Sequence, residues 1–217
     1  MNTQMRSPLV KMCGMTREED AASAIDLGAD AIGMIFFARS PRHVAIAQAA
    51  RIAVAVGTHG LKVGLFVNAD KPAIDTVLAS VPLDILQFHG DEPEAFCAGF
   101  GLPFWKTLRP RKAASLPAEI AAYPNAGGIL LDTWHPTKAG GTGEKFDWSI
   151  MAGIDPPEHL ILAGGLDPDN VEEAIRQVRP WAVDVCSGIE SSPGIKSASR
   201  MQDFMAACRR TAAPQPA

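Results

Sequence analysis

The sequence has no apolar run that approaches the roughly 20 residues of a membrane-spanning helix. Its first apolar run, residues 9–12, is short and is interrupted by Lys11, unlike the core of a secretion signal. An excess of one charge is also missing, because 20 Lys and Arg against 24 Asp and Glu leave a net charge of −4. We therefore expect a cytoplasmic protein with no nucleic-acid or membrane partner.

The four cysteines are too scattered to form a redox or zinc motif, with no C-x-x-C pair and no Cys/His zinc spacing. In a cytosolic protein they should stay reduced, and Cys97 and Cys208, in helical segments, are interpreted as packing residues. The sequence also lacks H-E-x-x-H, a complete calcium loop and a P-loop, so we expect no metal and no cofactor. The glycine-rich stretch 135–146 is interpreted as a flap that closes over the site.

What the sequence does have is a regular alternation of short apolar runs with helical segments. Helical spacing marks 17–27, 45–56, 71–81 and 198–210, and a helix is also expected from Pro168, capped by Asp167. The apolar runs lie near 9–14, 31–37, 61–67, 85–90, 103–108, 128–134, 159–164 and 182–187. This pattern favours an α/β fold, a single (β/α)₈ TIM barrel, over a doubly wound open sheet. We expect one domain over 1–217, with the barrel at about 8–210 and a flexible tail at 211–217.

Two glycine-rich strand ends near the C-terminus predict a phosphate site. The seventh run ends with Gly164 and Gly165, and the eighth is followed by Ser187 and Gly188. Glycines let backbone N–H groups approach an anion closely, and the loops after strands seven and eight hold phosphate in many such barrels. Glycines can also simply end strands, but two such sites on adjacent strands favour a phosphorylated small molecule as the ligand.

A thiol and a carboxylate follow two other strands. Cys13 ends the first predicted strand, next to a helix start that could favour a thiolate. A free cysteine is, however, often only a small buried apolar residue. Asp132 ends the sixth predicted strand, and its carboxylate could be a catalytic group, a loop cap or a salt-bridge partner. Because the carboxyl ends of barrel strands share one mouth, the two residues would form an acid/base pair there.

Further side chains are expected at the same mouth. Arg42, in the loop after the second strand, could hold a planar carboxylate bidentately or could lie solvated. His89 closes the fourth run and offers a polar contact. Asp184 is interpreted as structural, and Cys186 as pointing into the barrel or lying near the phosphate loop.

Together these motifs resemble the phosphoribosylanthranilate isomerase family, small (β/α)₈ enzymes of tryptophan biosynthesis. The matching segments occur in the family's order and cover nearly the whole chain: Lys11-Met12-Cys13-Gly14, Gly28-Ala29-Asp30-Ala31-Ile32-Gly33, Ser40-Pro41-Arg42, Gly64-Leu65-Phe66-Val67-Asn68, Gln87-Phe88-His89-Gly90, Leu131-Asp132, Gly140-Gly141-Thr142-Gly143, Phe146-Asp147-Trp148, Leu162-Ala163-Gly164-Gly165-Leu166 and Asp184-Val185-Cys186-Ser187-Gly188-Ile189-Glu190.

The resemblance implies a cofactor-free Amadori rearrangement of N-(5-phosphoribosyl)anthranilate to 1-(2-carboxyphenylamino)-1-deoxyribulose 5-phosphate. The family's aspartate, matching Asp132, protonates the ring oxygen and opens the ribose to a Schiff base. Its cysteine, matching Cys13, then removes the C2′ proton, giving an enolamine that tautomerises to the ketone. Its arginine, matching Arg42, holds the anthranilate carboxylate. We expect a monomer rather than a homodimer.

Two positions depart from the family's pattern. Cys186 stands where the family commonly has serine, which removes a hydroxyl contact to the phosphate but leaves the backbone contacts. Lys196-Ser197 stands where the family often has Lys-Asp, and we expect this change to alter a helix cap and not the chemistry.

Other functions fit parts of the pattern. A Schiff-base aldolase would need a lysine where Asp132 ends its strand, and a metal-dependent epimerase would need several mouth residues in addition to His89. A dual isomerase that also acts on a histidine-pathway aminoaldose usually pairs acids at strands one and five, which Cys13 argues against. A non-catalytic phosphometabolite-binding barrel would need neither Cys13 nor Asp132.

Overall fold

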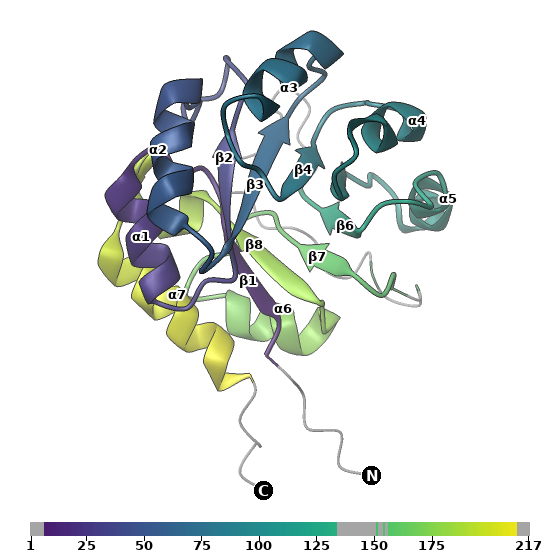
Figure 1. Ribbon diagram of the computed structural model, residues 1–217. Coiled ribbons are helices and arrows are strands. Elements are labelled where there is room, and N and C mark those ends of the chain that lie inside the picture. Colours follow the sequence, from purple (N-terminus) through teal and green to yellow (C-terminus); the bar gives the residue numbers. More distant parts are fainter. Residues whose placement is uncertain (1–6, 134–150, 152–153, 155, 212–217) are drawn as a thin grey trace, which may run out of the picture.

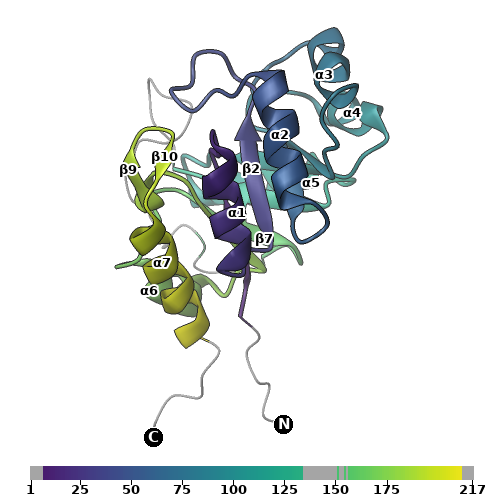
Figure 2. The same cartoon turned by 60° about the vertical axis from the view of Figure 1, so that its left-hand side comes forward.

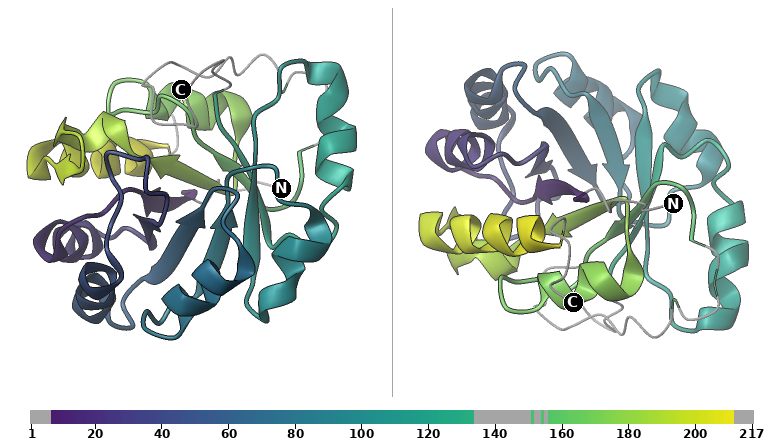
Figure 3. Two further views of the ribbon diagram at one scale, coloured as in Figure 1. Left: turned by 90° about the horizontal axis from the view of Figure 1, so that it is seen from above. Right: turned by 90° about the horizontal axis from the view of Figure 1, so that it is seen from below.

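The computed structural model describes residues 7–133, 151, 154 and 156–211, and these residues form a closed barrel of eight parallel strands (Figures 1 and 3). The strands follow one another around the barrel in chain order, and β8 pairs with β1 to close it. The barrel strands are β1 Leu9–Met12, β2 Ala31–Ile35, β3 Leu61–Phe66, β4 Ile85–Phe88, β5 Phe104–Leu108, β6 Gly128–Leu131, β7 Leu160–Leu162 and β8 Ala182–Val185. The predicted barrel is confirmed, and the open-sheet alternative is wrong.

Each predicted apolar run contains one strand, but most strands end before the run does. β1 ends at Met12 and β8 at Val185, so Cys13 and Cys186 lie one residue beyond their strands. Asp132 follows β6 in the same way. The chemically active side chains of these runs therefore stand on the rim of the barrel, where its strands pass into loops.

Helices cover the outside of the barrel, as Figure 3 shows from both ends. Their bounds are α1 Glu18–Asp26, α2 Ile46–Val56, α3 Lys71–Leu78, α4 Glu94–Cys97, α5 Leu116–Ala121, α6 Val171–Val178 and α7 Ala198–Arg210, with 3₁₀ turns η1 Ala98–Phe100 and η2 Ala113–Ser115. In Figure 2, α7 lies against α1 and α6, which brings the last helix next to the first. The helices predicted at 17–27, 45–56, 71–81 and 198–210 are confirmed within three residues.

The predicted helix start at Pro168 is wrong, because the chain first makes a capped turn. The Asp167 carboxylate accepts hydrogen bonds from the backbone N–H groups of Asp169 and Asn170, at 2.9 and 3.0 Å. Helix α6 begins only at Val171, with Asn170 at its N-cap position. Asp167 thus caps the turn before the helix and not the helix itself.

After β8 the chain makes a short hairpin that returns to the mouth. The turn η4 Ser187–Ile189 leads into β9 Glu190–Ser192, which pairs antiparallel with β10 Ile195–Lys196. Ser197 then caps α7, since its side chain accepts a hydrogen bond from the Arg200 N–H. The difference between Ser197 and the aspartate that the family often has at this position therefore affects a helix cap, as predicted.

Two apolar layers hold the barrel together. The outer layer joins strand residues such as Met12 and Leu86 to helix residues such as Ile52 and Phe204. The second contains no helix residue and fills the barrel interior: Ala31, Val63, Ile85, Trp105, Leu130, Ile161, Ala163 and Ala182. Because this packing closes the interior, the space for a ligand is left at the mouth.

The fold also bears on the predictions for two cysteines, for membrane-spanning helices, and for the flap and the tail. Cys97 and Cys208 are buried in the outer layer, which confirms them as packing residues. No helix in the described part combines the length and the apolar character that crossing a bilayer requires. The predicted flap at 135–146 and the predicted tail beyond Thr211 lie outside the described residues. Thr211 itself is buried, and its hydroxyl donates to the Cys208 carbonyl.

Candidate active site

A cavity opens at the mouth of the barrel, where the strands end. It encloses about 90 Å³ and is open to solvent on its outer side. Its lining combines residues from the rim of almost every strand with the loops behind them: Cys13, Ile35, Phe37, Ser40, Arg42, Leu65, Val67, Gln87, His89, Asp132, Ala163, Gly164, Gly165, Leu166, Asp184, Cys186 and Ser187.

Cys13 lies at the end of β1 with its side chain directed into the cavity. Its backbone N–H donates to the Val185 carbonyl at 2.8 Å, which ties the residue to the end of β8. Gly33 on β2 leaves room for the thiol, since a Cβ there would come within 2.7 Å of the Cys13 sulfur. A hydrogen bond with Cys186, together with burial, raises the pKa of Cys13 well above its usual value.

A buried ion pair stands directly below the thiol. Lys11 Nζ lies 2.7 Å from Asp184 Oδ1, and both side chains are buried. Burial disfavours the ammonium, but Asp184 and Cys13 outweigh it and raise the pKa of Lys11. The pair agrees with a structural role for Asp184. Lys11 is not among the predicted site residues, although a lysine that interrupts a buried strand two residues before Cys13 is a signal that could have identified it.

Asp132 and His89 face the cavity from β6 and β4. Asp132 Oδ2 lies 3.4 Å from His89 Nε2, and Asp132 Oδ1 accepts a hydrogen bond from the Thr133 N–H at 2.8 Å. Among the residues that the structure describes, neither ring nitrogen of His89 has a hydrogen-bond partner, and neither does Oε1 of the buried Gln87 beside it. Buried polar atoms in a protein are rarely left unpaired, so this wall is suited to a polar ligand.

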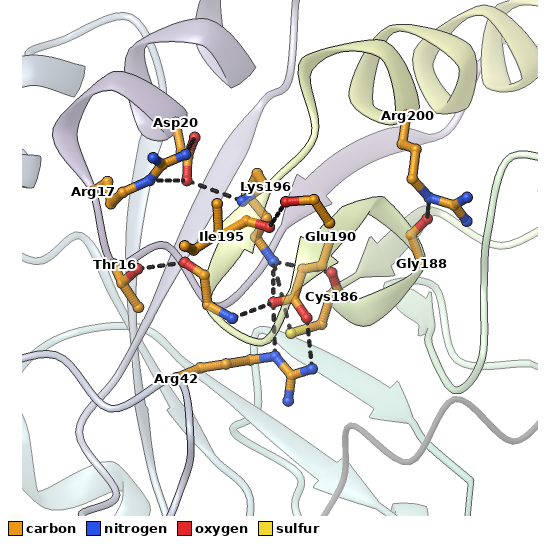
Figure 4. Close-up of polar contacts among 12 residues, drawn as sticks. Thr16, Arg17, Asp20, Arg42, Cys186, Gly188, Glu190, Ile195, Lys196 and Arg200 are labelled. Carbon is orange, nitrogen blue, oxygen red and sulfur yellow. Dashed lines mark hydrogen bonds and ion pairs between the residues drawn. The ribbon is translucent and has the colours of Figure 1, made fainter.

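Arg42 lies at the cavity wall and is buried, so the solvated alternative is wrong. Its Nε and Nη2 donate to the two carboxylate oxygens of Glu190, at 2.8 and 2.7 Å. The same carboxylate accepts from Lys196 Nζ at 3.0 Å, and Figure 4 shows it between the two cations. Burial opposes the charge of Glu190, but these cations lower its pKa. Glu190 and Lys196 were quoted from the sequence only for their match to the family's pattern and were given no place in the site, because the β9–β10 hairpin that returns them has no clear signal.

The glycine loops after β7 and β8 form another wall. Gly164 and Gly165 have φ angles of +83° and +67°, which side-chain-bearing residues rarely adopt. A Cβ at Gly188 would lie 2.0 Å from the Leu166 carbonyl oxygen, so this glycine lets the two loops touch. Gly164, Gly165 and Ser187 line the cavity, whereas Gly188 supports them from behind. At these glycines no side chain covers the backbone of the two loops beside the cavity.

The chain matches the family model of N-(5′-phosphoribosyl)anthranilate isomerase over residues 10–207. The chain belongs to the phosphoribosylanthranilate isomerase family. Among curated members, it is 51% identical to the enzyme of Pseudomonas fluorescens strain Pf-5 over 202 residues, covering 93% of this chain and 95% of the relative. It is 50% identical to the enzyme of Pseudomonas aeruginosa strain PAO1 over 200 residues, covering 92% and 94%.

Solved structures of the family share the fold and cover nearly the whole chain. The isomerase of Thermotoga maritima superposes with a TM-score of 0.86 at 35% identity, covering 94% of this chain and 99% of that one. A family structure in complex with reduced 1-(o-carboxyphenylamino)-1-deoxyribulose 5-phosphate has a TM-score of 0.83 at 34% identity, with the same coverage. Another, with the same score, identity and coverage, describes monomers generated from the dimeric Thermotoga maritima enzyme.

Proposed function

We propose that this protein converts N-(5-phosphoribosyl)anthranilate into 1-(2-carboxyphenylamino)-1-deoxyribulose 5-phosphate, an isomerisation in tryptophan biosynthesis. One observation carries the proposal: a carboxylate, Asp132, and a thiol, Cys13, line the same cavity, together with two glycine loops suited to phosphate. A proton donor and a proton acceptor are the two groups that an Amadori rearrangement needs. Family membership supports the same reaction.

In the first step Asp132, as the carboxylic acid, donates its proton to the ribose ring oxygen. The C1′–O bond breaks, the nitrogen lone pair forms the C=N bond, and a protonated Schiff base results. The hydrogen bond from the Thr133 N–H to Oδ1 holds the carboxyl group in one orientation and leaves Oδ2 toward the cavity and His89. We assign His89 a polar contact to the sugar, because its ring nitrogens form no hydrogen bond with any residue that the structure describes.

In the second step Cys13 takes the proton from C2′. The electron pair of the C2′–H bond becomes the C1′=C2′ double bond of the enolamine, and the Schiff-base nitrogen accepts the pair of the former C=N bond. Tautomerisation then gives the ketone. Each proton transfer between a positioned side chain and its substrate contributes about 10²–10⁴-fold, and neither step requires a cofactor or metal.

We also assign residues to the two charged ends of the substrate, the 5′-phosphate and the anthranilate carboxylate. We assign the 5′-phosphate to the N–H groups of the loops at Gly164, Gly165 and Ser187, which line the cavity. Arg42 is placed to bind the anthranilate carboxylate, since Glu190 occupies Nε and one edge of Nη2 while Nη1 points away from it in Figure 4. We further propose that the protein acts in the cytoplasm on this soluble metabolite. A single chain supplies all of these residues, so a monomer remains our prediction.

The assay is the loss of anthranilate fluorescence on addition of the phosphoribosylated substrate. The unmodified protein should turn over, and Cys13→Ala should lower kcat by about 10²–10⁴-fold, because the group that receives the C2′ proton is gone. Cys208→Ala, which removes a sulfur from the outer apolar layer, is the control and should keep its turnover. No turnover by the unmodified protein, or near-normal turnover by Cys13→Ala, would refute the proposal.

A further inference from the structure

The two strands that close the barrel place two cysteines side by side. In the β1–β8 register Lys11 pairs with Asp184 and Met12 with Val185, so Cys13 and Cys186 form the next pair. Neighbouring strands lie about 4.8 Å apart, and side chains two residues apart share a face. Lys11 and Cys13 therefore point into the barrel opposite Asp184 and Cys186. The thiols form one layer directly above the ion pair, and both line the cavity.

The charges around the two thiols are not the same. Cys13 stands above Lys11 and Asp184, one cation and one anion that are already paired with each other at 2.7 Å. Cys186 stands among Arg42, Lys196 and Glu190, two cations that share a single carboxylate. Before a substrate carboxylate binds Arg42, one positive charge is thus left over beside Cys186. Buried charges in proteins are normally balanced, so an anion is expected at this position.

The sulfur of Cys186 is placed to be that anion. Lys196 Nζ lies 4.0 Å from Cys186 Sγ and donates to the Cys186 carbonyl at 2.9 Å (Figure 4). A Cβ on Gly14 would lie 2.9 Å from both Cys186 Sγ and Arg42 Cδ, so the arginine stem and the sulfur meet over that glycine. A hydrogen bond from Cys13, assisted by Lys196 and Arg42 against burial, lowers the pKa of Cys186 to about 7.

We propose that Cys186 carries the resting thiolate of the site and accepts the proton of Cys13 while Cys13 takes the C2′ proton of the substrate. The inference rests on the proposed isomerase reaction. Cys186 acts through Cys13 and does not contact the substrate carbon. As the C2′–H bond breaks, its proton joins the Cys13 sulfur, and the proton already on Cys13 moves to the Cys186 sulfur. Cys13 therefore never has to hold a stable thiolate of its own.

This assignment gives the serine-to-cysteine departure at position 186 a chemical meaning. A serine hydroxyl stays neutral and can only donate or accept a hydrogen bond, whereas a thiol beside two cations ionises near neutral pH. The basic group of the pair then has a pKa close to physiological pH, where general-base catalysis is most efficient.

Thiolate absorbance in the ultraviolet, measured on the free protein against pH, locates the charge without any substrate. Burial raises the pKa of Cys97 to about 11 and that of Cys208 to about 12, so neither interferes near neutral pH. One thiolate per chain should form as the pH rises through about 7, and Cys186→Ser should abolish that step. Cys13→Ser should keep it, since a hydroxyl still donates, whereas Cys13→Ala should move it to higher pH. A neutral-range thiolate that persists in Cys186→Ser would overturn the proposal.

The pH profile of kcat/KM tests the proton transfer itself. Protonation of Cys186 removes the base, so activity should fall tenfold per unit as the pH drops below about 7. In Cys186→Ser this acidic limb should move up by about one unit or more, which lowers kcat/KM at neutral pH about tenfold, with recovery at higher pH. An unchanged limb, or an equal loss at every pH, would overturn the inference while leaving the isomerase reaction intact.

Alkylation of the unmodified protein requires no variant. After a brief reaction with iodoacetamide, mass spectrometry should find the label on Cys186, at a rate that follows the same titration near neutral pH. Preferential labelling of Cys13 with that pH dependence would overturn the proposal. Absence of turnover would instead refute the proposed function, and the titration and alkylation would still locate the thiolate.

Discussion

The two sides of the mouth are built on different principles. The thiol side consists of Cys13 and Cys186 with the charged residues around them, Lys11, Asp184, Arg42, Lys196 and Glu190, and nearly every charge there has a partner within 3.0 Å. The acid side consists of Asp132, His89 and Gln87. Within the described part of the chain, its Asp132 and His89 approach each other to 3.4 Å, and three of its buried polar atoms have no hydrogen bond.

The two sides differ in what fixes their polar groups in place. Ion pairs set the thiol side before any ligand arrives, so its electrostatic environment is preorganised for taking a proton. The acid side keeps polar atoms unsatisfied, at a cost of about 1–3 kcal/mol for each such group, and a polar ligand would relieve that cost. We therefore infer that the thiol side serves proton abstraction, whereas the acid side serves ligand binding and proton donation.

Substitution of the acid side's carboxylate should have the largest effect on catalysis. Asp132→Asn keeps an oxygen for the Thr133 N–H but cannot donate a carboxylic proton, so kcat should fall about 10²–10⁴-fold. The folded state should survive, as judged by an unchanged urea unfolding midpoint. Asp26→Asn, at the exposed end of α1, is the matched control. A loss of less than tenfold would remove Asp132 from the first step.

Breaking the ion pair beneath the thiols should have the largest effect on stability. Lys11→Met leaves the Asp184 carboxylate buried without its partner, and we expect a loss of about 3–5 kcal/mol in the free energy of unfolding, measured by urea denaturation. Lys71→Met removes one partner of the exposed Lys71–Asp75 pair and should cost at most about 1 kcal/mol. Equal losses in the two variants would contradict a preorganised thiol side.

A smaller effect is expected where the thiol side meets the substrate's carboxylate. Arg42→Lys keeps the positive charge but loses the planar fork that can bind Glu190 and a second carboxylate together. KM should rise about tenfold with a smaller change in kcat, as measured by steady-state fluorescence kinetics. Arg51→Lys, at an exposed pair with Glu18, is the control. An unchanged KM would show that the carboxylate is bound elsewhere.

Local sequence patterns were enough to predict the barrel strands, several of the helices and most of the rim, but not α4, α5 or the β9–β10 hairpin. Continuous apolar runs predicted all eight strands, because strands buried on both faces have no polar alternation. Residues at the ends of those runs, such as Cys13, Asp132 and His89, could be assigned to one mouth because parallel strands end at the same edge. The error at Pro168 arose because an aspartate can cap a turn as well as a helix.

The partners of these residues could not be predicted in the same way. Arg42 pairs with a glutamate 148 positions away, and Lys11 with an aspartate 173 positions away. Such pairings depend on strand register and on the return of the β9–β10 hairpin, neither of which leaves a local pattern. The neighbours of Cys186 were hidden for the same reason.

The sequence by itself thus determined the barrel, its mouth and the residue types that stand there, because apolar periodicity and strand ends are local properties of the chain. Only the tertiary structure decided which charges neutralise one another. Ionisation of a buried thiol depends on the sum of charges within a few ångströms, and residues far apart in the chain supply that sum. Closing β8 against β1 brought Cys186 beside Cys13, and the return of the β9–β10 hairpin placed two cations and one carboxylate around Cys186.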